Sequence, residues 1–209
     1  MTSELVAASW RAVIRLPLVV PAAAAAALLV GSAPVLDDGY AMQVLRGIGV
    51  LLACSLVVVA DDPAGEVLAA SPFPRAVRTA ARGAAAVSVV LPIWISAALV
   101  VEVMASYVPV LALGVEALAY AAMGLAVGAG LRAWKGSLTP SYAAGPAVVG
   151  LALATNLSPR TWALLQEQTW GPPWVAAQIR WIALLVLGAA VLVLAVRDPL
   201  SRPRRTASH

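Results

Sequence analysis

Long apolar stretches separated by short polar ones make up most of the chain. A transmembrane helix needs about 20 consecutive apolar residues, and six stretches approach or reach this length, of which the fifth is the shortest. They lie at about residues 17–36, 43–60, 83–104, 107–131, 142–156 and 175–196. The pattern predicts an all-α membrane protein: residues 1–209 form a single transmembrane domain whose six-helix bundle covers residues 17–196.

The two ends of the chain have patterns of their own. In residues 1–16, apolar side chains recur on one helical face. This predicts an amphipathic interfacial helix that ends at Pro17, although an extension of the first span is the alternative. Residues 197–209 are predicted to form a basic cytoplasmic tail.

The segment between the fifth and sixth spans, residues 155–174, mixes tryptophan with glutamine and glutamate. Ser158 followed by Pro159 is typical of a helix start, with the serine as N-cap. We therefore expect short outer helices here, with tryptophan at the depth of the lipid headgroups. Two arrangements remain open, a re-entrant hairpin buried in the protein and a loop that lies on the surface.

Composition strengthens the membrane assignment. The chain is 62% hydrophobic and only 11% charged, and its mean hydropathy is +0.90. A soluble domain of this size has too little interior for so much apolar surface, which argues against a soluble enzyme, a disordered chain and a disulfide scaffold. Cys54 is predicted to be a small buried apolar residue, and the single histidine, His209, is terminal. We therefore expect no catalytic, cofactor-binding or metal-binding residues in this chain.

The basic residues are distributed unevenly between the two sides of the predicted bundle. With the N-terminus inside, eleven of the 14 Lys and Arg residues fall on one side: Arg11, Arg15, Arg75, Arg78, Arg82, Arg132, Lys135, Arg197, Arg202, Arg204 and Arg205. Only Arg46, Arg160 and Arg180 fall on the other. Basic residues collect on the cytoplasmic side of membrane proteins, so both termini are predicted to be cytoplasmic. No basic face is left for nucleic acid, and membrane lipids are the expected neighbours of these charges.

The predicted cytoplasmic segment between the second and third spans has a distinctive order of residues. Asp61 and Asp62 are placed to cap a helix that begins near Pro63 and stops before Pro72. A second helix is expected to begin near Arg75 and to continue into the third span. A short helix joined to two spans would transmit a movement of a cytoplasmic partner to the transmembrane helices. The alternative is a structural loop that faces the lipid.

This segment resembles the coupling-helix region of ABC-2 type transporter permeases. An acidic residue is followed in order by glycine, an acid, leucine, proline and basic residues: Asp61 or Asp62, Gly65, Glu66, Leu68, Pro72, Arg75 and Arg78. The threonine and second acid of the family pattern have no clean counterpart. The predicted layout, with an N-terminal amphipathic helix, six spans and outer helices between spans five and six, is also similar to that family.

The resemblance implies a permease subunit of an ATP-driven exporter in a bacterial cytoplasmic membrane. It implies two partners: a separate cytoplasmic ABC ATPase that binds ATP and magnesium, and a second copy of the chain or a related permease. This chain would not be an enzyme itself. Its nearest approach to a nucleotide-binding loop, residues 130–137, has lysine before glycine, which is the wrong order for a P-loop.

Three charged residues lie within predicted spans on the same side of the membrane. Glu102, Glu116 and Arg180 are expected either to form Glu–Arg ion pairs within the bundle or to line a substrate path. The Gly124–Gly128 pair favours close helix packing, either within the chain or between two copies.

Two other function classes remain open at this point. One is a membrane scaffold or assembly protein without transport activity. The other is a membrane-embedded enzyme that modifies lipids, for which Asp61, Asp62 and Glu66 are the candidate acids. The sequence does not indicate which substrate a transporter of this kind would carry.

Overall fold

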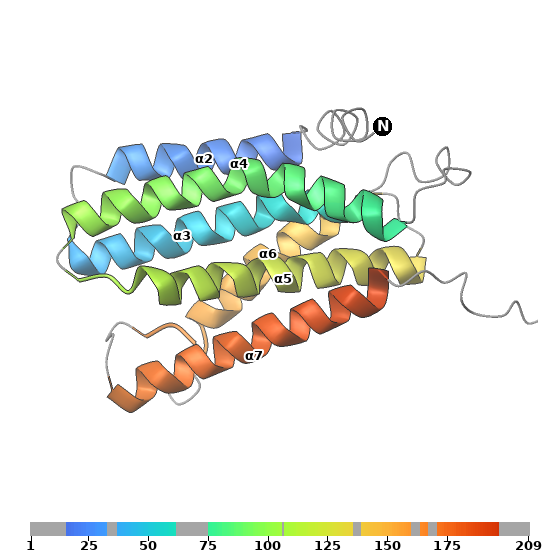
Figure 1. Cartoon of the computed structure of the whole chain (residues 1–209). Helices are drawn as coiled ribbons and strands as arrows, with labels where there is room; N and C mark the ends of the chain where they lie inside the picture. Colours follow the sequence, from blue (N-terminus) through green and yellow to red (C-terminus); the bar gives the residue numbers. More distant parts are fainter. Residues whose placement is uncertain are drawn as a thin grey trace, which may run out of the picture.

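The computed structural model describes residues 16–32, 37–61, 75–105, 107–135, 139–159, 164–166 and 171–196. These residues form helices and no strand: α2 (Leu16–Ser32), α3 (Asp38–Leu56), the 3₁₀-helix η2 (Val57–Ala60), α4 (Arg75–Met104), α5 (Val110–Lys135), α6 (Ser141–Asn156) and α7 (Gly171–Val196). The α-helices lie side by side and alternate in direction (Figure 1). The prediction of an all-helical bundle is confirmed for this part of the chain.

Four helical segments are long and apolar enough to cross a membrane by length and composition: Tyr40–Ala60, Thr79–Met104, Val110–Arg132 and Gly171–Ala195. They correspond to the second, third, fourth and sixth predicted stretches. The first stretch is a shorter apolar helix, Leu18–Ser32, and the fifth is α6 with 16 residues. Four long apolar helices in one chain are typical of a multi-pass membrane protein.

The helix ends follow from local sequence. Asp37 caps α3 because its carboxylate accepts a hydrogen bond of 2.8 Å from the Tyr40 backbone N–H. At the other end, three consecutive valines form η2, since β-branched side chains disfavour the α-helix. The long helix α4 begins at Arg75 and continues for 30 residues, as predicted. Helix α7 begins four residues before the predicted position, because prolines are tolerated in a first helical turn.

Helix α5 lies at the centre of the bundle and packs against α3, α6 and α7. Its small residues permit close approach. A Cβ atom placed on Gly124 would lie 2.5 Å from Val148 on α6, and one on Gly128 would lie 2.9 Å from Ala60. The Gly124–Gly128 face therefore packs within the chain, which is one of the two alternatives that the sequence left open.

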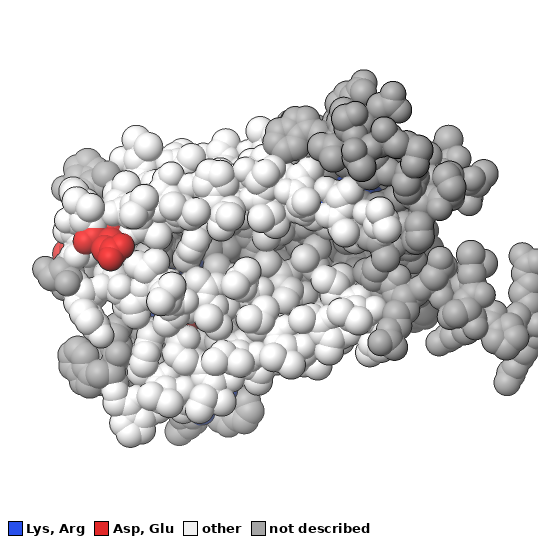
Figure 2. Space-filling view, in the orientation of Figure 1, with Lys and Arg blue, Asp and Glu red and all other residues white. Residues whose placement is uncertain are grey.

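The outside of the bundle is apolar and almost free of charge. On the face drawn in Figure 2, most of the described surface is uncharged, and acidic atoms gather near the end of α4. Large apolar side chains such as Val103, Leu111 and Leu194 are more than half exposed. Such a surface is unfavourable in water and suits contact with lipid.

Several predictions concern segments outside the described residues. These are the interfacial helix over residues 1–15, the segment from Asp62 to Pro74 and the tail over residues 197–209.

Candidate functional site

A buried ion pair joins the middle of α3 to the second turn of α5. The Arg46 Nε donates to Glu116 Oε2 at 3.0 Å, and Arg46 Nη2 donates to Glu116 Oε1 at 3.4 Å. The side chains are only 6% and 2% exposed. Breaking such a pair from one side leaves an uncompensated buried charge, which typically costs about 3–5 kcal/mol.

Two further groups complete the hydrogen bonding of this pair. Gln178 on α7 donates to Glu116 Oε1 at 3.2 Å. The same Arg46 Nη2 donates to the backbone carbonyl of Gln166 at 3.1 Å. Arg46, Glu116 and Gln178, which we call the polar cluster, therefore connect α3, α5 and α7 with the segment that precedes α7.

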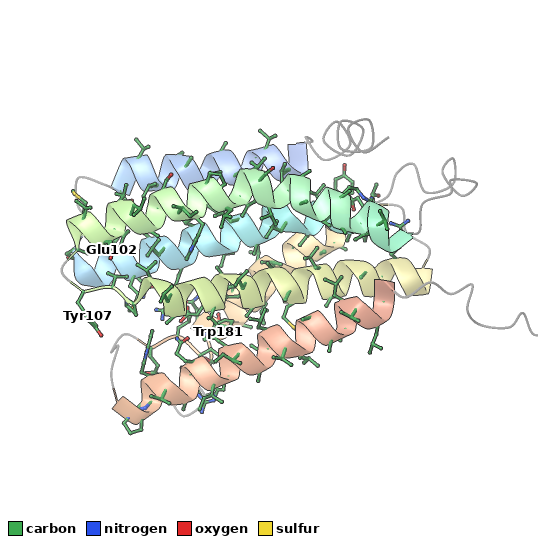
Figure 3. All side chains as sticks on the ribbon, viewed as in Figure 1. Glu102, Tyr107 and Trp181 are labelled. Atoms are coloured by element: carbon green, nitrogen blue, oxygen red, sulfur yellow. The ribbon has the colours of Figure 1, made fainter. Side chains whose placement is uncertain are left out.

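An aromatic layer lies beside the polar cluster. The Trp181 Nε1 donates to the backbone carbonyl of Leu164 at 2.9 Å, and its ring centroid is 4.9 Å from that of Tyr120. The Tyr120 hydroxyl is 2.8 Å from Thr155 Oγ1 on α6. Trp181 is fully buried and lies where α7 faces α5 (Figure 3). These contacts tie α6 to the same end of the bundle.

The sequence left two readings open for Glu102, Glu116 and Arg180, namely Glu–Arg ion pairs within the bundle or a substrate path. Glu116 does form a buried ion pair, and the arginine in it is Arg46. Arg180 is half-buried on α7, and Glu102 is exposed near the end of α4 (Figure 3). The structure thus brings Glu116 into the polar cluster and leaves Glu102 outside it.

The structure describes only part of the segment between α6 and α7. The Ser158 hydroxyl donates to the Thr155 carbonyl at the end of α6, and residues 160–163, where the predicted helix would begin, lie outside the described residues. Residues 164–166 are half-buried and not helical. The carbonyls of Leu164 and Gln166 accept hydrogen bonds from inside the bundle, so these residues pack against the helices; the neighbouring residues 160–163 and 167–170 lie outside the described ranges.

A second polar contact lies at the opposite end of the bundle. The Asp61 carboxylate accepts from the Ser141 backbone N–H at 2.9 Å and from the Ser141 hydroxyl at 2.6 Å. Asp61 is only 5% exposed. This carboxylate caps α6, whose own N-cap residue is a proline without a side-chain hydrogen bond. The helix that Asp61 was predicted to cap, beginning near Pro63, lies outside the described residues. Arg132 supports this contact by donating to the neighbouring Ala60 carbonyl at 3.2 Å.

The remaining residues of the predicted coupling segment are not tested by the structure. Asp62, Gly65, Glu66, Leu68 and Pro72 lie outside the described residues. Arg75 and Arg78 belong to the first turn of α4, but the structure describes only their backbone.

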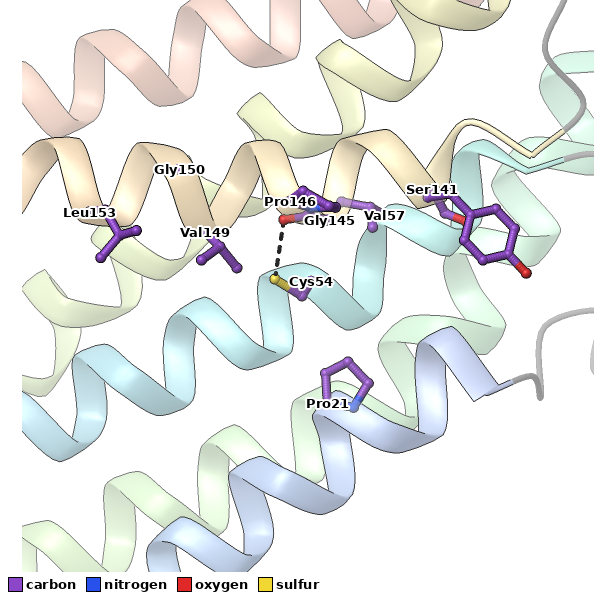
Figure 4. A pocket seen from close by; sticks show the side chains of 10 residues that line it. Pro21, Cys54, Val57, Ser141, Gly145, Pro146, Val149, Gly150 and Leu153 are labelled. Atoms are coloured by element: carbon purple, nitrogen blue, oxygen red, sulfur yellow. Dashed lines mark hydrogen bonds between the residues drawn. The ribbon is translucent and has the colours of Figure 1, made fainter.

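A groove of about 720 Å³ runs along the outside of the bundle between α2, α3 and α6 (Figure 4). Its walls are almost entirely apolar and include Pro21, Val57, Val149 and Leu153. The Cys54 thiol lies in the groove and donates to the Gly145 carbonyl at 3.7 Å. The groove contains no charged side chain, so it is chemically distinct from the polar cluster.

Within the described ranges, no three His, Cys, Asp or Glu residues come together as a metal site would require. Comparison with protein-family models, with curated proteins and with solved structures found no match to this chain. The similarity of residues 61–78 to ABC-2 permeases therefore rests on the sequence alone.

Proposed function

We propose that this chain is the permease subunit of an ATP-driven ABC transporter, acting as an exporter in a bacterial cytoplasmic membrane. A separate ATPase subunit binds and hydrolyses ATP on the cytoplasmic side. The chain itself performs no chemistry. It changes conformation and pairs with a second copy or a related permease, so that a substrate passes through the membrane.

The contacts of the residues on either side of the 62–74 segment are the observation that carries this proposal. The segment follows Asp61, whose carboxylate is bonded to the first residue of α6, and it precedes the first residue of α4. A partner that moves this segment would pull on α4 through the chain and on α6 through Asp61. This is the mechanical arrangement that a coupling helix needs, and it supports the resemblance to ABC-2 permeases in residues 61–78.

The alternation of helix directions supports the proposed orientation. The ends of α3, α5 and α7 lie at the same end of the bundle as the starts of α2 and α4 (Figure 1). Arg82 and Arg132 belong to this end, and in the sequence the basic terminal segments directly precede α2 and follow α7. We infer that this end is cytoplasmic and that α2 and α6, although short, complete six spans.

The polar cluster would then lie in the outer half of the membrane. Arg46 and Asp61 are 15 positions apart, which corresponds to about 22 Å along a helix. Charges at such a depth usually face a cavity or a partner and mark functional sites. We assign to the cluster the task of joining α3, α5 and α7 so that a movement started at the cytoplasmic end reaches the outer end.

Co-purification of the tagged chain from its own cells, in mild detergent, tests the proposal. We expect a stoichiometric partner with a P-loop, and ATP hydrolysis by the complex. The Glu66→Arg and Arg75→Glu variants should lose the partner or its coupled activity, because both alter the contact segment. Glu102→Arg, an equal charge change on the opposite end, should retain both.

Two results would contradict the permease proposal. One is recovery of the chain alone without ATPase activity, which would favour a scaffold or assembly protein. The other is a lipid-modifying activity of the isolated chain that Asp61→Asn or Glu66→Gln abolishes, which would favour a membrane-embedded enzyme.

A further inference from the structure

At the outer end of the bundle, two side chains donate hydrogen bonds to backbone carbonyls of the segment 164–166. Trp181 donates to the Leu164 carbonyl at 2.9 Å, and Arg46 donates to the Gln166 carbonyl at 3.1 Å. Both donors belong to long helices and both are buried. They contact backbone atoms of residues 164–166, so this recognition does not depend on which side chains the segment carries.

The two acceptor carbonyls belong to residues two positions apart. In an extended peptide, successive residues point to opposite sides, so carbonyls two positions apart point the same way. Donors that contact alternate carbonyls are a common way for proteins to bind peptides, with side-chain pockets adding specificity. Here Leu164 and Leu165 pack against the buried cluster that contains Tyr120 and Trp181.

The site offers one donor more than residues 164–166 use. The Nη1 of Arg46 is buried and has no hydrogen-bond partner among the described residues. A buried charged donor without an acceptor is unfavourable. A ligand with a further oxygen acceptor would therefore be bound more completely than the segment that now occupies the site.

We propose that Arg46, Trp181 and the Tyr120 ring form a binding site for an apolar peptide, occupied in this structure by residues 164–166 of the chain itself. This inference names the substrate class of the transporter and in that respect rests on the proposed function. The ligand is uncharged at its centre, because Glu116 already neutralises Arg46. It carries apolar side chains, which replace Leu164 and Leu165, and backbone carbonyls, which accept from Trp181 and Arg46.

Peptide binding to the full chain in lipid nanodiscs tests this inference. The probe is a dye-labelled peptide, blocked at its C-terminus, that copies residues 163–168 (ALLQEQ), and the readout is fluorescence polarisation. In the natural chain the tethered segment competes at high effective concentration. The double variant Leu164→Ser and Leu165→Ser loses the apolar contacts that keep this segment in the site. The variant chain should therefore bind the probe at least about tenfold more tightly than the natural chain.

Matched tryptophan variants show whether the proposed donors are used. In the double-variant background, Trp181→Phe keeps an aromatic ring, although a smaller one, and removes the N–H, and we expect binding to weaken about five- to tenfold. Trp94→Phe on α4 is the same substitution at a ring that packs against Gly49 and Gly114, and it should leave binding unchanged because no hydrogen bond joins Trp94 to residues 164–166 in the described part of the chain. A dodecyl compound without backbone amides should not displace the probe.

The outcomes separate this inference from the proposed function, because no ATPase is present in the assay. Absence of probe binding to the double variant, or binding that Trp181→Phe does not weaken, would overturn the peptide site whether or not an ATPase partner exists. Should the double variant not give a monodisperse sample, Leu165→Ala is the milder test, with a smaller gain expected and the same loss on Trp181→Phe.

Discussion

Arg46 and Glu116 are 70 positions apart in the chain, and their Nε and Oε2 atoms are 3.0 Å apart in the bundle. With both side chains almost completely buried, each neutralises the charge of the other in a place that water hardly reaches. Removing one partner should therefore be far more harmful than removing both.

We expect Glu116→Ala to lower the free energy of unfolding by about 3–5 kcal/mol, because it leaves Arg46 buried without a countercharge. Thermal unfolding in detergent measures this loss. The double variant Arg46→Leu and Glu116→Leu should recover most of it, since both charges are then gone. Glu102→Ala, at an exposed position, should change the value by less than about 0.5 kcal/mol. Equal effects of Glu116→Ala and Glu102→Ala would contradict a buried pair.

The contact between Asp61 and Ser141 should behave as a coupled pair. Asp61→Ala removes two hydrogen bonds to a buried carboxylate and should cost about 1–3 kcal/mol of stability. In a double-mutant cycle with Ser141→Ala, the two losses should not add, because the hydroxyl bond is lost once. Asp37→Ala is the matched control, as Asp37 also caps a helix but is exposed. Additive losses at Asp61 and Ser141 would show that the contact does not form.

The close approach of α5 and α7 should make one glycine sensitive to substitution. A Cβ on Gly188 would lie 2.8 Å from the Ala122 carbonyl carbon, which belongs to the backbone and has no room to yield. We expect Gly188→Ala to destabilise the bundle by about 1–3 kcal/mol. Gly150→Ala, with nothing within 4 Å of the added atom, should be neutral or stabilising by up to about 1 kcal/mol. The melting temperatures of the two variants, measured in the same detergent, test this expectation: only that of Gly188→Ala should fall below the value of the natural chain.

The sequence predicted the helices well because their apolar stretches are long. Its errors concern helix ends: the sixth stretch, for example, extends back to Gly171. The short fifth stretch also matched, since α6 covers Ser141–Asn156. Hydropathy counts residues without regard to neighbours, so it finds helices but does not show how they pack.

The site was harder to predict for the same reason. Glu116 was recognised as a charge within a span, whereas Arg46 was not chosen as its partner, because which helix faces meet depends on packing across 70 positions. A signal existed: Arg46 lies eight residues inside α3 and carries the charge opposite to that of Glu116 on the same predicted side. For Asp61, the sequence suggested only a local cap near Pro63 and gave no sign of its contact with Ser141, which is 80 positions away.

The proposed orientation predicts which loops a membrane-impermeant thiol reagent reaches. In a Cys54→Ala background, Tyr107→Cys should react in intact spheroplasts, because Tyr107 is exposed between α4 and α5 at the end that we place outside (Figure 3). Gly136→Cys, between α5 and α6, should react only after the membrane is permeabilised. The opposite pattern would invert the proposed topology.

Photo-crosslinking from the 62–74 segment tests the central claim most directly. A photoreactive amino acid in place of Glu66 should crosslink the chain in living cells to a P-loop ATPase, identified by mass spectrometry. The same amino acid in place of Tyr107, at the opposite end of the bundle, should not. An ATPase captured from Glu66 alone is the result that a permease with a cytoplasmic coupling segment predicts. Absence of an ATPase at Glu66, or its equal capture from Tyr107, would contradict the account.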